Sequence, residues 1–305
     1  MPHNSMTSSF GFATEGTAVI AVAKSAWAKP PAKESFLRVA NQLSAGILAA
    51  MSIERVNVLG VGISVLNLRS ALAAIAEAVS ARRKGYICVT GVHGVMEAQA
   101  DETFRAILNG AFLCTPDGMP MVWAGKLNGH RDMRRVYGPD LMLDVCKWSE
   151  TSGCRHFFYG GAPGVAELLA RKLKEKFPRL EVVGTFTPPF RRLNADEEAG
   201  LQVQVRETRP DILWVGLSTP KQEKFMAEYL SKLDVTLMVG VGAAFDFHSG
   251  RVKQAPRWMQ RSGLEWFYRL CSEPRRLAKR YLKNNPLFVL KFTAQLCGLK
   301  RYPLR

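Results

Sequence analysis

Short apolar segments alternate with helical segments from residue 55 to residue 241, and this alternation constrains the fold more than any other feature. Each apolar segment ends at a turn, and a segment with helical periodicity follows it. The alternation occurs at least six times, which predicts a mainly parallel sheet with helices on both faces. We therefore expect an α/β, Rossmann-like core. The predicted strands cover residues 55–61, 86–90, 111–114, 155–159, 180–184, 211–217 and 235–241.

Composition divides the chain into three regions. Residues 1–50 are rich in Ala, Ser, Thr and Lys, which predicts a poorly ordered extension. Residues 51–250 hold the Rossmann-like core, with a helix capped by Asn67 and a loop that contains His93. Residues 251–305 form a tail that is expected to be helical, with breaks at Pro274 and Pro286.

Positive charge is concentrated in the tail. The chain has a formal net charge of +16, and residues 251–305 contain 14 Lys or Arg against 2 Asp or Glu. Such a charge favours an anionic partner, either a nucleic acid or an acidic membrane surface. Aromatic side chains such as Trp258 and Trp266 alternate with the basic ones at helical spacing, which is typical of a helix lying among lipid headgroups. Nucleic-acid binding through the same charges remains an alternative.

The cysteines and the apolar segments bear on the cellular compartment. The six cysteines form no CxxC pair, so neither a zinc site nor a disulfide framework is indicated and a reducing compartment is expected. The chain has no run of 18 apolar residues, which predicts that no helix spans a membrane. Residues 17–28 make a poor signal peptide, because Lys24 interrupts them and no basic leader precedes them.

A single carboxylate, that of Asp117, follows the predicted strand 111–114 where the chain breaks at Pro116 and starts a helix. In alternating α/β proteins, ligands bind where strand ends meet helix starts. This position suits an acid that acts on a bound substrate. Alternatively, Asp117 caps the helix.

Glycine recurs in the turns that follow three predicted strands. These glycines include Gly160, Gly161, Gly240 and Gly242. Glycine lets the backbone approach a ligand closely, and the next helix presents free N–H groups, so a diphosphate would suit these turns. Strand-to-helix turns also need glycine for their own geometry, and neither GxGxxG nor a Walker A lysine occurs.

Two further polar residues stand at strand ends. Gln222 lies in the first turn of a predicted helix, where it could bond a sugar or a phosphate or simply face solvent. Asp246 lies between two phenylalanines after a buried strand, so it is either tightly hydrogen-bonded or functional. The chain has no DxD pair to hold a metal on a diphosphate, so helix N-termini and residues such as Arg135 would have to meet that charge.

Eight sequence blocks together resemble one family. They occupy residues 115–120, 135–142, 158–164, 215–223, 240–247, 251–259, 263–270 and 273–276. In this order and spacing they cover about residues 53–285, and they resemble the bacterial WecG/TagA/CpsF glycosyltransferases.

The resemblance implies an enzyme that moves a sugar from a UDP-sugar to a polyprenyl-diphosphate-linked sugar, in exopolysaccharide or cell-wall polymer synthesis. It implies inversion at the anomeric carbon, no metal and no other cofactor. By this similarity Asp117 would be the general base, Thr90 would line the pocket and Gln222 would contact substrate. The phosphates would be faced by Arg135, Arg269 and Arg276.

The resemblance also implies a location and partners. The enzyme would be cytoplasmic and peripheral on the inner face of the plasma membrane, held to the acidic lipid surface by residues 251–305. No nucleic acid is expected as a partner, and the oligomeric state is open, with a homo-oligomer compatible.

One departure from the family pattern concerns His93. Many relatives have a Thr-Pro-Asn type sequence after the second strand, whereas this chain has Thr90-Gly91-Val92-His93. His93 either orients the acceptor or assists Asp117, or it is purely structural. The identity of the sugar therefore stays open among N-acetylmannosamine, glucose and others.

Two other functions compete with the glycosyltransferase. A basic nucleic-acid-binding protein with an incidental α/β core would show strongly salt-dependent binding. A nucleotide-dependent oxidoreductase is disfavoured by the missing GxGxxG motif.

Overall fold

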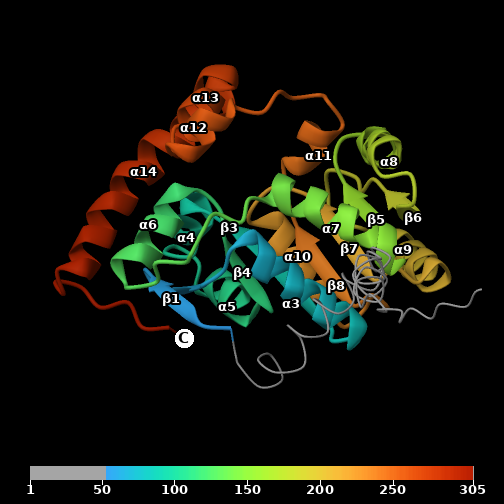
Figure 1. Cartoon of the computed structure of the whole chain (residues 1–305), viewed down its shortest axis with the longest axis horizontal. Coiled ribbons are helices and arrows are strands. Elements are labelled where there is room, and N and C mark those ends of the chain that lie inside the picture. The colour runs from blue at the N-terminus through green and yellow to red at the C-terminus, as the bar shows by residue number, and fades with distance from the viewer. Residues whose placement is uncertain (1–52, 305) are drawn as a thin grey trace, which may run out of the picture. The chain divides into compact units, whose positions relative to one another are not determined.

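A computed structural model describes residues 53–304, and within this range it leaves the side chain of Arg276 undescribed (Figure 1). The extension expected over residues 1–50 lies outside the described residues. The description below concerns residues 53–304 throughout.

The prediction of a mainly parallel α/β sheet is confirmed. Six strands form one sheet in the order β4-β3-β8-β7-β5-β6, and every neighbouring pair is parallel. The strands are β3 (Gly85–Thr90), β4 (Leu113–Pro116), β5 (Arg155–Gly160), β6 (Glu181–Phe186), β7 (Ile212–Gly216) and β8 (Leu237–Gly240). Five of the six are buried apolar runs, because helices cover both faces of the sheet.

The strand predicted over residues 55–61 is not a strand of this sheet. It splits into β1 (Arg55–Val58) and β2 (Val61–Ser64), which pair antiparallel in a separate two-stranded sheet. The cause is the turn between them, where Leu59 and Gly60 both have positive φ, 53° and 82°. Two successive residues with positive φ reverse the chain as in the favoured two-residue hairpin turns.

Each face of the sheet carries its own hydrophobic cluster. Alternate residues of one strand point to opposite faces, so Phe157 joins the cluster on one side and Phe158 the cluster on the other. The first face is covered by α4 (Val92–Glu97), α5 (Glu102–Gly110), α6 (Met119–Leu127), α9 (Ala195–Thr208) and α10 (Lys221–Tyr229). The second face is covered by α3 (Leu68–Ser80), α7 (Gly138–Ser152), α8 (Val165–Lys176) and α11 (Ala244–His248).

Residues near the start of α3 and of α4 explain where these two helices begin. Asn67 caps α3 as predicted, and it forms a reciprocal capping box with Ser70. His93, expected in a loop, lies instead in the first turn of α4. The helix starts early because Gly91 supplies an extended N-cap directly after β3.

The tail consists of helices in the described residues, with no strand after β8. Its helices are α12 (Arg257–Arg261), α13 (Glu265–Ser272) and α14 (Pro274–Leu296). The break at Pro274 is the start of α14, whereas the predicted break at Pro286 does not occur. A proline at 286 deprives the carbonyl of Leu282 of its partner. Leu282 is 69% exposed, so water can satisfy that carbonyl and the helix continues.

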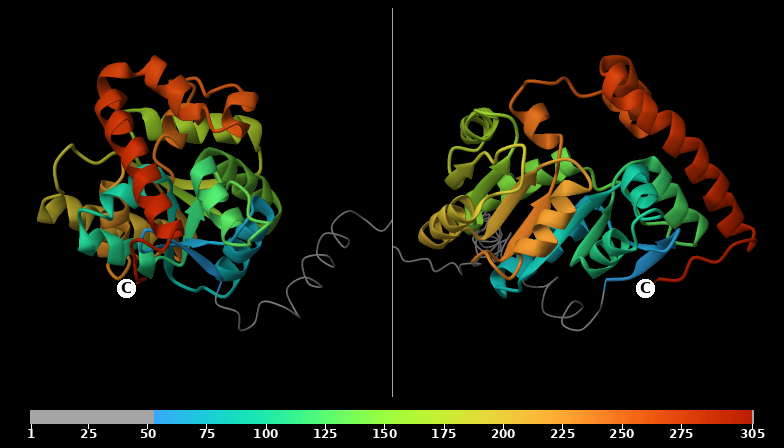
Figure 2. Two further views of the ribbon diagram at one scale, coloured as in Figure 1. Left: turned by 90° about the vertical axis from the view of Figure 1, so that its left-hand side faces the viewer. Right: turned by 180° about the vertical axis from the view of Figure 1, so that it is seen from behind.

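The tail returns to the start of the core. In Figures 1 and 2, α14 runs along one side of the sheet domain, past α4, and ends near the β1–β2 hairpin. None of the helices in the described part of the chain is long and apolar enough to cross a bilayer.

Candidate active site

The carboxyl ends of β3 and β4 bring Thr90 and Asp117 together. The two strands are neighbours, and the backbone N–H of Asp117 donates to the carbonyl of Thr90 at 2.9 Å. Gly91 is equally close, since a Cβ atom at this position would lie 2.9 Å from the carbonyl oxygen of Asp117. Residue 91 must therefore be glycine, because any side chain at this position would prevent the ends of β3 and β4 from approaching each other this closely.

Asp117 does not cap the helix that follows it. The N-cap of α6 is Gly118, with φ of 86°, and no side chain bonds the helix N-terminus. The Asp117 side chain is 32% exposed. Burial raises the pKa of Asp117 to about 6, and Arg135 acts in the opposite direction. The carboxylate is thus mostly ionised at neutral pH and has a pKa suited to accepting a proton.

Arg135 joins Asp117 to the tail. Its Nη2 lies 3.7 Å from Asp117 Oδ1 and also bonds the carboxylate of Glu265 in α13. The Tyr137 hydroxyl donates to the other Glu265 oxygen at 2.7 Å, and its ring stacks under the guanidinium at 3.8 Å. The Nε of Arg135 is buried without a partner among the described residues. Two acids and one arginine are therefore held together beside the end of β4.

Glu265 was not predicted as a site residue. Its signal in the sequence was weak, because it is one acid among the aromatic and basic residues of block 263–270. Arg269 follows it by four residues, so both lie on the same face of α13. The Arg269 guanidinium lies 5.8 Å from the ring centre of Phe247, and its charge also lowers the pKa of Asp117. The side chain of Arg276 lies outside the described residues.

Thr90 and His93 differ in their surroundings. Thr90 is buried, and its hydroxyl accepts from the thiol of Cys114 at 3.2 Å. His93 Nδ1 lies 3.3 Å from the amide nitrogen of Asn284 in α14 and 3.5 Å from Glu97. Burial lowers the pKa of His93, and Arg280 lowers it further. The partners of His93 thus come from α4, from α14 and from the backbone of Thr219, and Asp117 is not among them.

A cavity of about 400 Å³ opens beside His93. Thr219 and Pro220, at the start of α10, form one side of it. The basic residues Lys279, Arg280 and Lys283 of α14 form the other side. The structure therefore places His93 against the basic face of α14.

Gln222 is packed at the end of β8. It is 3% exposed, and a Cβ atom on Gly240 would lie 3.1 Å from its Nε2. Gly242 is next to the same amide, 3.5 Å from Oε1 by the same measure. Gln222 Nε2 donates to Glu223 Oε1 at 3.0 Å, while Gln222 Oε1 has no partner among the described residues. The glycines thus make room for an amide with one free acceptor.

Glu223 is a second residue that the sequence did not single out. It is 1% exposed, and Oε1 accepts from the Thr219 hydroxyl at 2.9 Å. Burial raises the pKa of Glu223, and Oε2 has no partner among the described residues. Because Gln222 donates to Glu223, this acid sets the orientation of the amide.

The remaining predicted residues are farther from Asp117. Four strand spacings separate β4 from β5, so Gly160 and Gly161 lie roughly 19 Å along the sheet edge from Asp117. A Cβ atom on Gly160, which has φ of 121°, would lie 2.7 Å from the carbonyl of Gly216, so its own turn requires glycine. Asp246 is half-buried in α11, where its backbone carbonyl accepts from Arg251 and Val252. Within residues 53–304, no three His, Cys, Asp or Glu residues are grouped as a metal site would require.

Comparison with known proteins identifies the family of the chain. The chain matches the model of the glycosyl transferase WecG/TagA/CpsF family over residues 56–302. Two curated relatives are each named N-acetylglucosaminyldiphosphoundecaprenol N-acetyl-beta-D-mannosaminyltransferase. The one from Bacillus spizizenii strain W23 is 31% identical over 196 residues, which are 64% of this chain and 74% of the relative. The one from Bacillus subtilis strain 168 is 30% identical over 174 residues, 57% of this chain and 66% of the relative. The chain therefore belongs to the WecG/TagA/CpsF family of glycosyl transferases.

Proposed function

We propose that this glycosyltransferase moves N-acetylmannosamine, or a related hexose, from a UDP-sugar to a polyprenyl-diphosphate-linked N-acetylglucosamine. The names of the two relatives support the acceptor and the transferred sugar. The sheet edge supports an extended donor, because its glycine-bearing turns stretch from β5 to the carboxylate of Asp117. We place the reaction in the synthesis of a cell-surface polymer.

Asp117 is the general base in this proposal. An acceptor hydroxyl attacks the anomeric carbon of the donor from the side opposite to UDP, and it loses its proton in that step. The single observation that carries the proposal is a carboxylate at a strand end that caps no helix and lies 3.7 Å from an arginine. One attack with one base inverts the anomeric centre.

Arg135 and Arg269 stabilise the departing UDP. Preorganised cations near the developing charge of a leaving diphosphate lower the barrier without any change in protonation. Glu265 holds Arg135 in place through a charge-assisted hydrogen bond. We propose that these arginines take the place of a metal ion.

The tail rests on the acidic inner face of the plasma membrane in this proposal. Exposed aromatic side chains of α6, α12 and α13, namely Trp123, Trp258 and Phe267, support it. The turn before α13 packs on α6, since a Cβ atom on Gly263 would lie 3.1 Å from the Trp123 ring. These aromatic residues therefore belong to one region that also contains the basic residues of α12.

One assay tests the proposal. The protein is incubated with a panel of UDP-sugars and polyprenyl-diphosphate-N-acetylglucosamine in phosphatidylglycerol vesicles, with and without EDTA. We expect one sugar to be added with inverted configuration, assigned by NMR, at a rate unchanged by EDTA, and the protein to sediment with the vesicles. No transfer from any UDP-sugar would refute the donor class, and a loss of transfer in EDTA would refute metal independence.

A further inference from the structure

A second cavity, of about 300 Å³, lies at the far end of α14 from His93. It is open to solvent and lined by residues of the end of α14, the last residues of the chain, the β1–β2 turn and the α4–α5 junction. We call it the C-terminal pocket. Asp117, Arg135 and Glu265 are not among its lining residues, so it is separate from the candidate active site.

Hydrogen bonds fix the walls of the C-terminal pocket. Gln295 of α14 accepts from the N–H of Leu59 at 2.8 Å and donates to the carbonyl of Asn57 at 3.0 Å. The Asn57 side chain donates to the carbonyl of Tyr302 at 2.6 Å. The hairpin turn, the helix end and the chain end are thus joined by hydrogen bonds within the chain.

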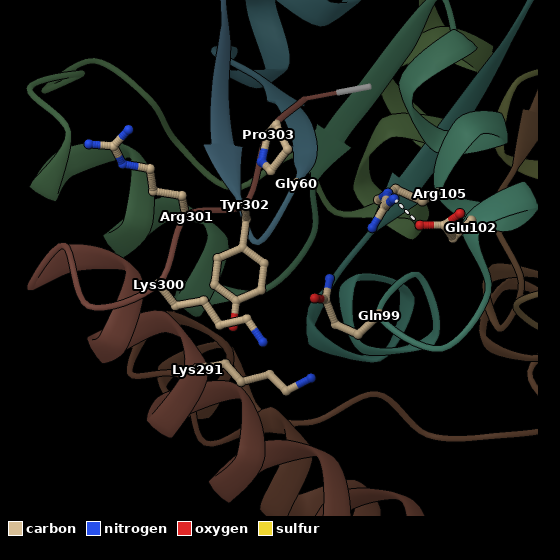
Figure 3. Close-up of a pocket in the computed structure, with 9 residues that line it drawn as sticks. All are labelled: Gly60, Gln99, Glu102, Arg105, Lys291, Lys300, Arg301, Tyr302 and Pro303. Carbon is tan, nitrogen blue, oxygen red and sulfur yellow. Dashed lines mark hydrogen bonds and ion pairs between the residues drawn. The ribbon is translucent and has the colours of Figure 1, made fainter.

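Positive charge converges on this pocket. In Figure 3 the ammonium groups of Lys291 and Lys300 point into the same space beside the Tyr302 ring, whereas Arg301 points away from it. Arg105, across the pocket, bonds Glu102 at 2.9 Å. Among the described residues, no acidic group lies within ion-pair distance of Lys291 or Lys300.

The Tyr302 hydroxyl adds a donor without a partner. It is buried and makes no hydrogen bond to any described residue. The Lys300 ammonium lies 5.4 Å from the centre of its ring. A buried hydroxyl without a partner is costly, and a ligand oxygen would remove that cost.

We propose that the C-terminal pocket binds a phosphate group. Two ammonium groups and a phenol hydroxyl supply donors from several directions, which suits the several oxygens of a phosphate better than the two oxygens of a carboxylate. Two converging lysines also supply enough positive charge to neutralise a phosphodiester, with one negative charge, or a phosphate monoester, with about two. This site goes beyond the proposed transfer reaction and does not depend on it.

The phosphate can belong to a lipid headgroup or to a soluble compound. Leu299 precedes Lys300 in the chain and is 81% exposed, so an apolar side chain next to a lining residue is open to contact with a lipid surface. The pocket itself recognises the phosphate that both sources share.

Acetylation of lysines by a water-soluble reagent, followed by mass spectrometry, gives a local readout on the full chain. Inorganic pyrophosphate represents the soluble source, and phosphatidylglycerol vesicles, compared with phosphatidylcholine vesicles, represent the lipid source. We expect Lys291 and Lys300 to be acetylated about tenfold more slowly with one of these ligands. Lys147 and Lys174, exposed on α7 and α8, serve as controls whose rates should not change. Protection by pyrophosphate identifies a soluble ligand, and protection by phosphatidylglycerol alone identifies a headgroup.

Matched variants complete the test. In calorimetry, the protecting ligand should bind the Lys291→Ala/Lys300→Ala variant about tenfold more weakly than the wild type. The Tyr302→Phe variant should lose affinity too, but by a smaller factor than the double variant. The Lys147→Ala/Lys174→Ala variant, which loses the same charge elsewhere, should bind as the wild type does. Equal protection of all four lysines, no protection by either ligand, or equal loss of binding in the two double variants would overturn the proposal.

Discussion

His156 is a buried polar residue outside the candidate active site, and both of its ring nitrogens form hydrogen bonds. The Trp214 indole N–H donates to His156 Nδ1 at 2.9 Å, and His156 Nε2 lies 2.8 Å from the Ser149 hydroxyl. Because Nδ1 accepts, Nε2 carries the proton and donates to Ser149. The Ser149 hydroxyl then donates to the carbonyl of Val145 at 2.8 Å. The chain of bonds is complete only when His156 is neutral.

This state predicts a pH-dependent stability. Burial lowers the pKa of His156 to about 3, below its ordinary value of 6.5. The unfolded chain then binds a proton that the folded chain rejects, so the stabilisation present above pH 6.5 is lost as the pH falls toward 3. From pH 7 to pH 5, the free energy of unfolding of the wild type should drop by about 2 kcal/mol more than that of His156→Gln. Urea unfolding of both proteins measures this difference. An equal drop in both would contradict it.

At the scale of elements, α13 influences the site through the carboxylate of Glu265 and the guanidinium of Arg269, which shift the pKa of Asp117 in opposite directions. Burial raises the pKa of Asp117 to about 6, Arg135 opposes this, and Glu265 adds to it. In the proposed reaction Asp117 must be ionised, so kcat/KM should rise with pH up to about 6 and level off above it. We call this rise the acidic limb of the pH profile. The pH at its midpoint depends on the charges around Asp117.

Two neutralising substitutions should move this limb in opposite directions. Glu265→Gln removes a negative charge and frees Arg135 for Asp117, so the limb should shift to lower pH. Arg135→Gln removes the positive charge 3.7 Å from Asp117, so the limb should shift to higher pH even where the rate is reduced. Profiles of kcat/KM against pH for the three proteins test this. Shifts in the same direction, or none, would show that another group titrates.

The same elements show what the sequence could and could not predict. Apolar runs predicted the six sheet strands, and five of them are buried because helices cover both faces of the sheet, whereas β6 lies at its edge. The split at Leu59 was missed, since a leucine gives no signal for positive φ. Helix α14 continues through Pro286 because Leu282 is exposed and its carbonyl can bond water. The exposure of Leu282 depends on how the helix packs, which the sequence does not show. The place of Asp117 at a strand end is visible in the sequence, whereas the contact between Glu265 and Arg135 joins residues 130 apart in the chain and is visible only in the structure.

At the scale of the whole chain, the order of the strands brings the site together. The last strand, β8, enters between β3 and β7, so Gly240 and Gln222 lie two strand spacings from Asp117, roughly 10 Å. The tail then returns over the sheet and supplies Glu265 and Arg269 from α13. Residues that follow β3, β4 and β8 therefore lie along the same carboxyl edge of the sheet, where α/β proteins bind ligands.

The central claim is that Asp117 removes the acceptor proton, and the variant Asp117→Asn tests it most directly. Asparagine keeps the shape of the side chain and cannot act as a base. Turnover should fall about 10³-fold, while the Kd for UDP stays within about twofold of the wild type, since Asp117 is not proposed to bind the nucleotide. Asp196→Asn, an exposed change at the start of α9, is the matched control and should retain full turnover. If Asp117→Asn turns over within about tenfold of the wild-type rate, another residue is the base.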